Sequence, residues 1–181
     1  MPMLVTESLH AEAFAPFGDV LAYDAAASWE VNGGWARRAD LAAVLDDGGA
    51  NGPPLLALFR ASHQPLPSTV VFVERHPHSS QVFLPLAPAG FLVVVAPETA
   101  DGAPDLARAR AFLGQPGQGI NYRRGVWHAP ITATDADTDF LMLIWERGIP
   151  NDCIVHTLPA PLTIHEPTAG LTALYEAPHG A

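Results

Sequence analysis

The stretch VFVERHPHSSQVFLPL, from Val71 to Leu86, sets a polar segment between two short apolar runs. The first run ends at Val73, the second follows Gln81, and both are rich in β-branched and aromatic residues. Short runs of this kind, bounded by turn-forming residues, are typical of β-strands. The stretch therefore predicts two strands joined by a polar loop.

Runs of the same kind recur along the chain. The predicted strands cover Leu55–Phe59, Val70–Val73, Gln81–Leu86, Phe91–Ala96, Phe140–Trp145 and Ile154–Leu158. Helical periodicity is confined to Glu7–Phe14 and Asp105–Leu113, where short helices are expected. The 18 prolines and 15 glycines suit a fold with many turns. The pattern predicts an all-β sandwich or barrel.

The composition is that of a chain that folds as one domain. With 181 residues, of which 49% are hydrophobic and 15% charged, the chain is long and apolar enough to bury a core. We expect a single domain over residues 1–160. Residues 161–181 are rich in proline and are expected to form a tail on the surface or against a partner subunit.

Charge and residue usage exclude several classes of function. A net charge of -10 would repel nucleic acid unless one face were locally basic, and the nine basic residues are all arginine, which excludes a lysine Schiff base. The longest apolar stretch, Phe91–Pro97, is far shorter than the roughly 20 residues that span a bilayer. The lone Cys153 cannot form an intramolecular disulfide and is expected to be a small buried group. These features favour a cytoplasmic protein without a membrane or nucleic-acid partner.

A second segment punctuated by glycine ends in histidine further along the chain. It reads GQGINYRRGVWH, from Gly117 to His128. Together the two segments resemble the two motifs of the cupin superfamily. The resemblance implies a small jelly-roll β-barrel with a few short peripheral helices, in which the motif residues point inward and usually hold a metal ion.

Two registers of the first cupin motif are open. One sets His76 and His78 on the histidine pair of the superfamily, which leaves Gln81 too early for the carboxylate position. The other sets Glu74, His76 and Gln81 directly on the motif, and we prefer it. Strand alternation places residues 74 and 76 on one face, so Glu74 and His76 are expected to point inward with Gln81 and His128. His78 would complete the set or lie at its rim.

Five runs narrow the resemblance from superfamily to family. They are Glu74-Arg75-His76-Pro77 with Gln81, Gly119-Ile120-Asn121-Tyr122, Val126-Trp127-His128, Thr138-Asp139-Phe140 and Asn151-Asp152-Cys153. Their order and spacing are similar to those of the ureidoglycolate lyase family, formerly called ureidoglycolate hydrolase. The resemblance implies cleavage of (S)-ureidoglycolate to glyoxylate and urea in allantoin degradation, a step of purine metabolism. It also implies a homodimer, and nickel is the ion associated with these lyases.

The implied substrate defines the roles to be filled. Ureidoglycolate is a carbinolamine that bears a carboxylate, so its cleavage requires a base for the hydroxyl and an acid for the departing urea nitrogen. Glu74 or His76 is the candidate base, and His128 is the candidate acid. A divalent metal is left open, with Glu74, His76, Gln81 and His128 as its ligands if one is present. Acid and base chemistry without a metal fits the same residues.

Further residues are candidates for substrate binding. Arg60 or Arg123 is the candidate carboxylate clamp, because a guanidinium group binds a carboxylate through two hydrogen bonds. Gln81, Asn121 and Tyr122 are candidates to orient the ureido group. Other notable side chains are expected to be structural, with Arg75 and Arg124 pairing outward with acids and Trp127 in the core or the cavity wall. The histidines without a motif partner are His10, His63, His156, His165 and His179.

Two other functions compete with the lyase as interpretations of the sequence. A cupin that binds a small carboxylate without turnover would carry the same fold, because folds host binding modules as readily as enzymes. A metal-dependent cupin dioxygenase or isomerase is the second rival. The lyase is favoured because the matching runs extend beyond the two cupin segments.

Overall fold

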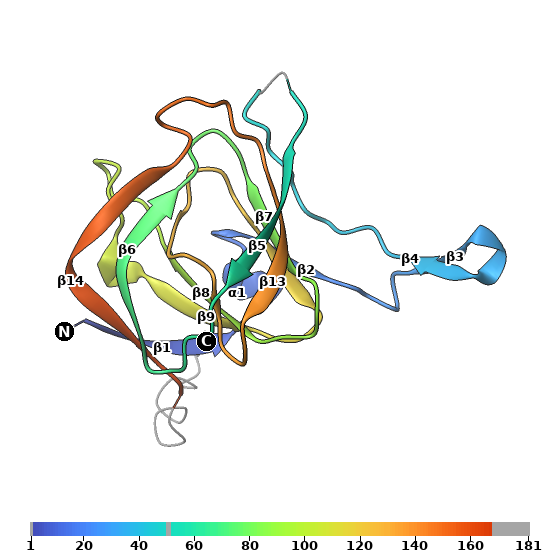
Figure 1. Ribbon diagram of the computed structural model, residues 1–181, viewed down its shortest axis with the longest axis horizontal. Helices are drawn as coiled ribbons and strands as arrows, with labels where there is room; N and C mark the ends of the chain where they lie inside the picture. Colours follow the sequence, from blue (N-terminus) through green and yellow to red (C-terminus); the bar gives the residue numbers. More distant parts are fainter. Residues whose placement is uncertain (1, 50–51, 168–181) are drawn as a thin grey trace, which may run out of the picture.

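Two β-sheets pack face to face in the computed structural model, which describes residues 2–49 and 52–167 (Figure 1). A seven-stranded sheet has the order β11-β6-β14-β1-β9-β8-β12, and a five-stranded sheet has the order β2-β10-β7-β13-β5. The strands of the first sheet are β1 (Met3–Ser8), β6 (Ser68–Arg75), β8 (Phe91–Ala96), β9 (Arg110–Gly114), β11 (Trp127–His128), β12 (Thr132–Ala133) and β14 (Ile154–His165). Those of the second are β2 (Gly18–Ala22), β5 (Leu55–Ala61), β7 (Gln81–Pro85), β10 (Gln118–Tyr122) and β13 (Thr138–Ile144).

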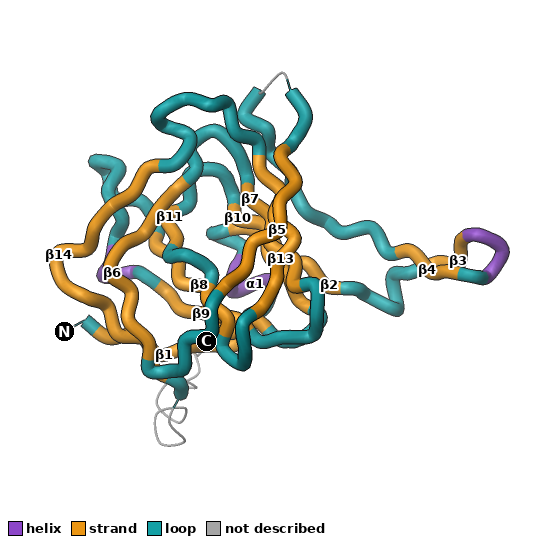
Figure 2. Tube along the Cα trace, viewed as in Figure 1, coloured by secondary structure: helices purple, strands orange, loops and turns teal. Residues whose placement is uncertain are grey.

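The larger sheet closes on itself. Because β11 pairs with both β6 and β8, six of its strands form a closed barrel, β11-β6-β14-β1-β9-β8. Among residues 2–49 and 52–167 the helical segments are short and few: α1 (Ala11–Phe14) and the 3-10 turns η1 (Asn32–Gly34) and η2 (Leu106–Arg108). The all-β, cupin-like barrel expected from the sequence is confirmed. Each predicted strand run is a strand of one of the two sheets (Figure 2).

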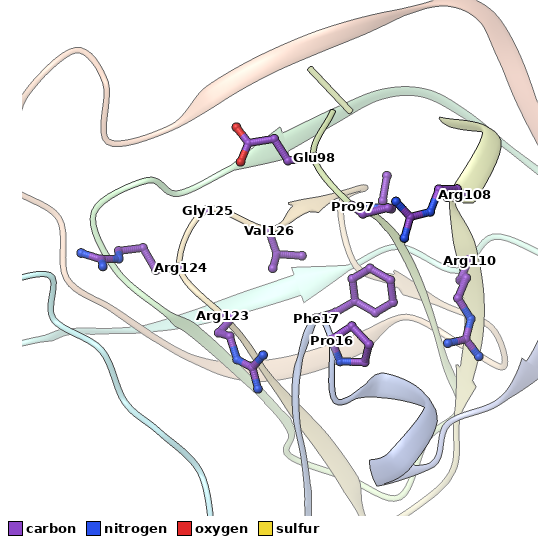
Figure 3. Close-up of a pocket in the computed structure, with 11 residues that line it drawn as sticks. Pro16, Phe17, Pro97, Glu98, Arg108, Arg110, Arg123, Arg124, Gly125 and Val126 are labelled. Atoms are coloured by element: carbon purple, nitrogen blue, oxygen red, sulfur yellow. The ribbon is translucent and has the colours of Figure 1, made fainter. Parts of the chain in front are cut away.

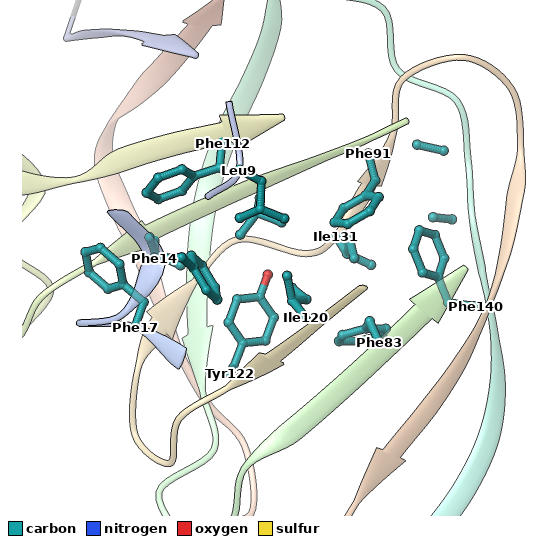
Figure 4. Close-up of a cluster of buried hydrophobic side chains, with 14 residues drawn as sticks. Leu9, Phe14, Phe17, Phe83, Phe91, Phe112, Ile120, Tyr122, Ile131 and Phe140 are labelled. Atoms are coloured by element: carbon teal, nitrogen blue, oxygen red, sulfur yellow. The ribbon is translucent and has the colours of Figure 1, made fainter. Parts of the chain in front are cut away.

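Two hydrophobic clusters account for the long apolar run of β8, whose six residues are all buried. Phe91, Val93 and Val95 face the space between the two sheets, where they meet Phe83, Tyr122 and other aromatic residues (Figure 4). Leu92, Val94 and Ala96 face the barrel interior. A strand buried on both faces needs apolar residues at every position, whereas a strand buried on one face needs them only at alternate positions.

Both predicted helices are largely wrong. The segment Glu7–Phe14 divides into the end of β1 and the single turn of α1, and Asp105–Leu113 divides into η2 and most of β9. β1 and β9 pair in parallel, with Thr6 opposite Ala111, and β1 also pairs in parallel with β14. Hydrogen bonds to partners far away in the sequence thus override a weak local helical preference.

Two segments depart from the main body. Strands β3 (Trp29–Val31) and β4 (Ala36–Arg38) pair only with each other, and this hairpin projects away from both sheets (Figure 1). At the other end of the chain β14 continues to His165, so the tail expected from residue 161 begins inside a strand. Residues 168–181, and His179 with them, lie outside the described residues. Within the described part of the chain, no helix is long and apolar enough to cross a membrane.

Candidate active site

Three side chains from the two sequence motifs converge on one face of the larger sheet. Glu74 is the second-last residue of β6, His128 ends β11, and the two stand directly opposite each other in the antiparallel pair. Their chain neighbours Val73 and Trp127 point into the barrel interior. Alternation therefore directs Glu74 and His128 to the other face, toward the five-stranded sheet.

His76 follows β6 directly and completes a group that we call the cluster: Glu74, His76 and His128. One ligand atom from each side chain lies within 4.8 Å of the others. His128 Nε2 is 3.8 Å from Glu74 Oε1, and the two imidazole centroids are 5.5 Å apart. His76 and His128 are buried, whereas the Glu74 side chain is 25% exposed. The cluster therefore lies at the rim of the space between the sheets, within reach of solvent through Glu74.

Both imidazoles are held in one tautomer by backbone carbonyl groups. His76 Nδ1 lies 3.1 Å from the carbonyl oxygen of Asp152, and His128 Nδ1 lies 2.9 Å from that of Val126. A carbonyl only accepts, so each Nδ1 carries its hydrogen and each Nε2 keeps a lone pair. Neither Nε2 atom has a hydrogen-bond partner among the described residues, although both are buried. Two lone pairs thus face a shared space.

Burial also sets the charge of this space. It lowers the pKa of His128 to about 3, and the nearby His76 adds to the effect. The ring of His128 is therefore neutral at neutral pH. A neutral ring with a bare Nε2 can accept a hydrogen bond or bind a metal ion, whereas donating a proton as an acid requires the imidazolium form.

Tyr122 and Gln81 lie on the five-stranded sheet, directly opposite each other in the pair formed by β10 and β7. The Tyr122 ring stacks on the His128 ring with centroids 4.1 Å apart and an interplanar angle of 15°. Burial and the Glu74 carboxylate raise the pKa of Tyr122, so its hydroxyl keeps its proton. Gln81 Nε2 lies 3.5 Å from Met142 Sδ. Within residues 2–49 and 52–167, Gln81 Oε1 and the Tyr122 hydroxyl have no hydrogen-bond partner.

A family model described as ureidoglycolate lyase matches residues 1–165. The chain belongs to the ureidoglycolate lyase family. Relatives named ureidoglycolate lyase include one from Burkholderia cepacia, 42% identical over 149 residues, which are 82% of each chain. One from Pseudomonas syringae pv. tomato is 40% identical over 86% of this chain and 90% of its own. One from Chelativorans sp. is 38% identical over 92% of this chain and 99% of its own.

Two of the residues expected to bind substrate in this member of the family lie away from the cluster. Arg60, on β5, donates two hydrogen bonds to Asp139 at 2.6 and 2.7 Å, and its side chain is 72% exposed. Asn121 points to the opposite face of β10 from Tyr122, where it donates to Asp19 and to the carbonyl of Val44. The structure thus does not bring Arg60 or Asn121 to the cluster.

Arg123 is exposed and lines a cavity with three other arginines, Arg108, Arg110 and Arg124 (Figure 3). None of the cluster residues lines that cavity. The expected pairing with acids is confirmed for Arg75, 2.6 Å from Glu98, and for Arg124, 3.1 Å from Asp46. The Arg75 side chain is not turned outward, because it is only 20% exposed and its guanidinium group stacks on the Trp127 ring. Trp127 is buried in the barrel interior, as expected.

The expectation of a buried Cys153 is wrong, because the residue is exposed. It lies directly after the loop that carries Asp152, and its Sγ is 3.6 Å from Glu74 Oε2. Partial burial and the Glu74 carboxylate raise the pKa of its thiol to about 11. Cys153 thus stands beside the cluster as a neutral thiol.

Sequence reasoning also missed the loop residues that orient the imidazoles. Asp152 acts through its backbone carbonyl on His76, and Val126 acts in the same way on His128. Both belong to runs that carry the family resemblance, which was the available signal. Hydrogen bonds donated to a backbone carbonyl leave no residue-type signature, so the sequence did not reveal the contacts.

Proposed function

We propose that this chain cleaves (S)-ureidoglycolate to glyoxylate and urea. The observation that carries the proposal is the convergence of Glu74, His76 and His128 in a member of the ureidoglycolate lyase family. Their polar atoms lie close enough to act on one small molecule. The orphaned Nε2 atoms offer hydrogen-bonding capacity that the described residues leave unused, which is expected of a site awaiting a ligand.

In the proposed reaction the hydroxyl proton passes to a base while the carbon–nitrogen bond breaks. The oxygen forms the aldehyde of glyoxylate, and the electron pair of the broken bond remains on the urea nitrogen, which takes up a proton. Glu74 and His76 are both placed to be the base. Their protonated form can return the proton to the nitrogen, so the reaction consumes no net proton.

The role of His128 in this proposal follows from its low pKa. As a neutral ring it orients the hydroxyl or holds a metal ion more readily than it supplies a proton. Stacking on Tyr122 fixes the plane of the ring. Gln81 and Tyr122, whose oxygen atoms lack partners in the described part of the chain, are proposed to hydrogen-bond the ureido group.

As the alternative to a free Glu74 or His76 base, we propose that the cluster holds one divalent metal ion, for which family resemblance suggests nickel. Its residues fit such an ion: two Nδ1–H tautomers present bare Nε2 atoms, and Glu74 adds a carboxylate. Gln81 Oε1 is a weak fourth candidate. When bound, the ion would supply the positive charge that the substrate carboxylate needs, a charge that Arg60 does not bring to the cluster.

The decisive experiment is a product assay with ureidoglycolate. We expect glyoxylate and urea in equal amounts, with no ammonia when urease is absent. Ammonia released at the rate of glyoxylate would show attack on the ureido carbonyl and would overturn the lyase. Saturable binding without turnover would favour the non-catalytic cupin. Products that require oxygen would favour the dioxygenase.

We further propose that the active protein is a homodimer. Leu56 and Leu58 are 61% and 72% exposed on the outer face of β5, an edge strand, and Trp35 in the projecting hairpin is 93% exposed. A two-stranded hairpin by itself is marginally stable in water, so a hairpin that pairs with neither sheet favours a partner surface. A second copy offers the same surfaces in a self-complementary arrangement. A cytoplasmic setting is proposed as well, because exposed Cys153 stays reduced there.

A further inference from the structure

A cavity of about 470 Å³ opens beside the loop that joins β10 to β11 (Figure 3). Residues 123–126 of this loop form one wall, and Phe17, Pro97 and Val126 give the cavity an apolar surface. Four arginines, Arg108, Arg110, Arg123 and Arg124, are among the residues that line it. Because the cluster residues do not line it, the cavity is a separate feature from the proposed active site.

The arginines make this cavity positive in a chain whose net charge is -10. Four of the nine basic residues line it, against a single carboxylate, that of Glu98. Glu98 is already engaged by Arg75, with 2.6 Å between Oε1 and Nη1. Guanidinium groups gathered around one space repel one another, and a bound anion would relieve that repulsion.

Two of the four arginines already have acidic partners. Arg110 donates to both carboxylate oxygens of Glu7, at 2.8 and 2.5 Å, and also to the carbonyl of Ala13. Arg124 lies 3.1 Å from a carboxylate oxygen of Asp46. Their charges are largely compensated, so they shape the cavity more than they attract a ligand.

The charges of Arg108 and Arg123 are not neutralised by a hydrogen-bonded acidic side chain among the described residues. Arg108 lies 3.9 Å from Asp105, too far for a hydrogen bond, and its side chain is 71% exposed. Arg123 forms no ion pair with any acidic side chain of residues 2–49 and 52–167. Both residues line the same cavity, and both side chains are exposed, so each guanidinium group can turn toward one anion bound there.

We propose that this cavity binds a small oxyanion with two negative charges, such as phosphate or a short dicarboxylate, between Arg108 and Arg123. The planar guanidinium group matches both kinds of oxyanion through paired hydrogen bonds. Arg123, which has no acidic partner among the described residues, and Arg108, whose acidic neighbour lies 3.9 Å away, together match a dianion better than a monoanion.

The cavity shares its loop with the cluster. The backbone N–H of Gly125 donates to the carbonyl of His76 at 2.9 Å, and the carbonyl of Val126 accepts from His128 Nδ1 at 2.9 Å. An anion on Arg123 restrains this loop and thereby stabilises the orientation of both imidazoles. Binding of the anion rests on the cavity alone, whereas an effect on turnover rests on the proposed function.

Titration calorimetry at low ionic strength tests the binding, with inorganic phosphate and malonate as dianion probes and acetate as the monoanion. We expect one saturable site per chain for at least one dianion and weaker binding of acetate. Arg108→Gln and Arg123→Gln should each weaken the dianion about tenfold or more, the loss expected of one charged hydrogen-bonded pair. Arg37→Gln makes the same charge change on the projecting hairpin and should leave binding unchanged, as should His128→Ala.

Each alternative outcome is decisive. Absence of saturable binding of both dianions, or equal weakening by Arg37→Gln, would overturn the site. Loss of binding in His128→Ala would place the anion at the cluster instead. Saturable binding in a chain that does not turn over ureidoglycolate would refute the proposed function and leave the anion site standing. If the chain turns over ureidoglycolate, the dianion should raise kcat/KM of wild type and leave that of Arg108→Gln unchanged. An equal rise in both proteins would overturn the link between anion binding and turnover.

Discussion

The two buried imidazoles carry the chemistry at the scale of single residues. Each is held by a backbone carbonyl through Nδ1, and each presents Nε2 to the same space. This arrangement depends on a few atoms, so removing one ring should destroy the site without removing much of the hydrophobic core.

We expect His76→Ala and His128→Ala each to lower kcat/KM for ureidoglycolate by about 100-fold or more, because the first removes a proposed proton-transfer group and the second the ring proposed to orient the hydroxyl or hold the metal ion. Exposed His10, which makes no side-chain cap to α1, is the matched control, and His10→Ala should retain wild-type turnover. Circular dichroism and gel filtration check that the variants fold. A loss below about tenfold in either cluster variant would remove these residues from the proposed roles.

Metal content gives a second test at this scale. Protein purified without chelator should carry close to one divalent ion per chain by elemental analysis, and Glu74→Gln should lose most of it. A chelator should lower Tm and turnover, and Ni²⁺ should restore both, because an ion that binds only the native state stabilises it. Glu12→Gln, an exposed carboxylate change on α1, is the control. Chelated protein with full activity would leave metal-free acid and base chemistry as the surviving mechanism.

The depressed pKa of His128 predicts how stability depends on pH. The unfolded chain protonates this ring near pH 6.5, whereas the folded chain resists protonation until about pH 3. Stability is therefore highest above pH 6.5 and falls as pH drops toward 3, by about 2 kcal/mol at pH 5 from this group. Urea unfolding of metal-free protein measures the free energy of unfolding at pH 7.5 and at pH 5. The decrease between the two pH values should be about 2 kcal/mol larger in wild type than in His128→Gln. Identical losses in both proteins would contradict the assignment.

A close backbone contact fixes the position of strand β2 against strand β10. Strand β2 lies on β10 with Gly18 opposite Tyr122, the residue that stacks on His128. A Cβ on Gly18 would overlap the carbonyl oxygen of Asn121. The position requires glycine because the two backbones approach too closely for any side chain.

Gly18→Ala should therefore lower the free energy of unfolding by about 1–3 kcal/mol, the usual cost of overpacking. It should also lower turnover, because β10 carries the stacking partner of His128. Gly52→Ala is the matched control, because no atom of the described residues beyond its chain neighbours lies within 4 Å of the added Cβ. Denaturant midpoints measure the difference. Equal midpoints for the two variants would show that β2 can move without cost.

The molecule exposes an apolar outer face on β5, and its β3–β4 hairpin forms no strand pairing with either sheet. Leu58→Glu should convert the proposed dimer into a monomer, because a charge buried in an apolar interface costs several kcal/mol. Light scattering should give twice the 19.2 kDa chain mass for wild type and the single mass for the variant. Met3→Glu, at an exposed apolar residue of β1 in the larger sheet, should stay dimeric. A monomeric wild type at tens of micromolar would refute the homodimer.

Local patterning determined much of this protein in advance. The apolar runs form strands, as their β-branched residues and short length predict. The polar segment after Val73 also lies where the sequence predicts it. The types of residue in the cluster, Glu74, His76 and His128, were likewise visible in the two motifs. These features depend on neighbours a few positions away.

Tertiary structure alone decided the rest. Whether Met3–Ser8 is a strand depends on β9 and β14, which lie more than a hundred residues away in the chain. The same holds for arginine: Arg60 is held by Asp139, whereas Arg123 has no described acidic partner, and nothing local distinguishes the two. Register across a sheet and burial set these outcomes, because they are properties of pairs of distant segments, which no single segment encodes.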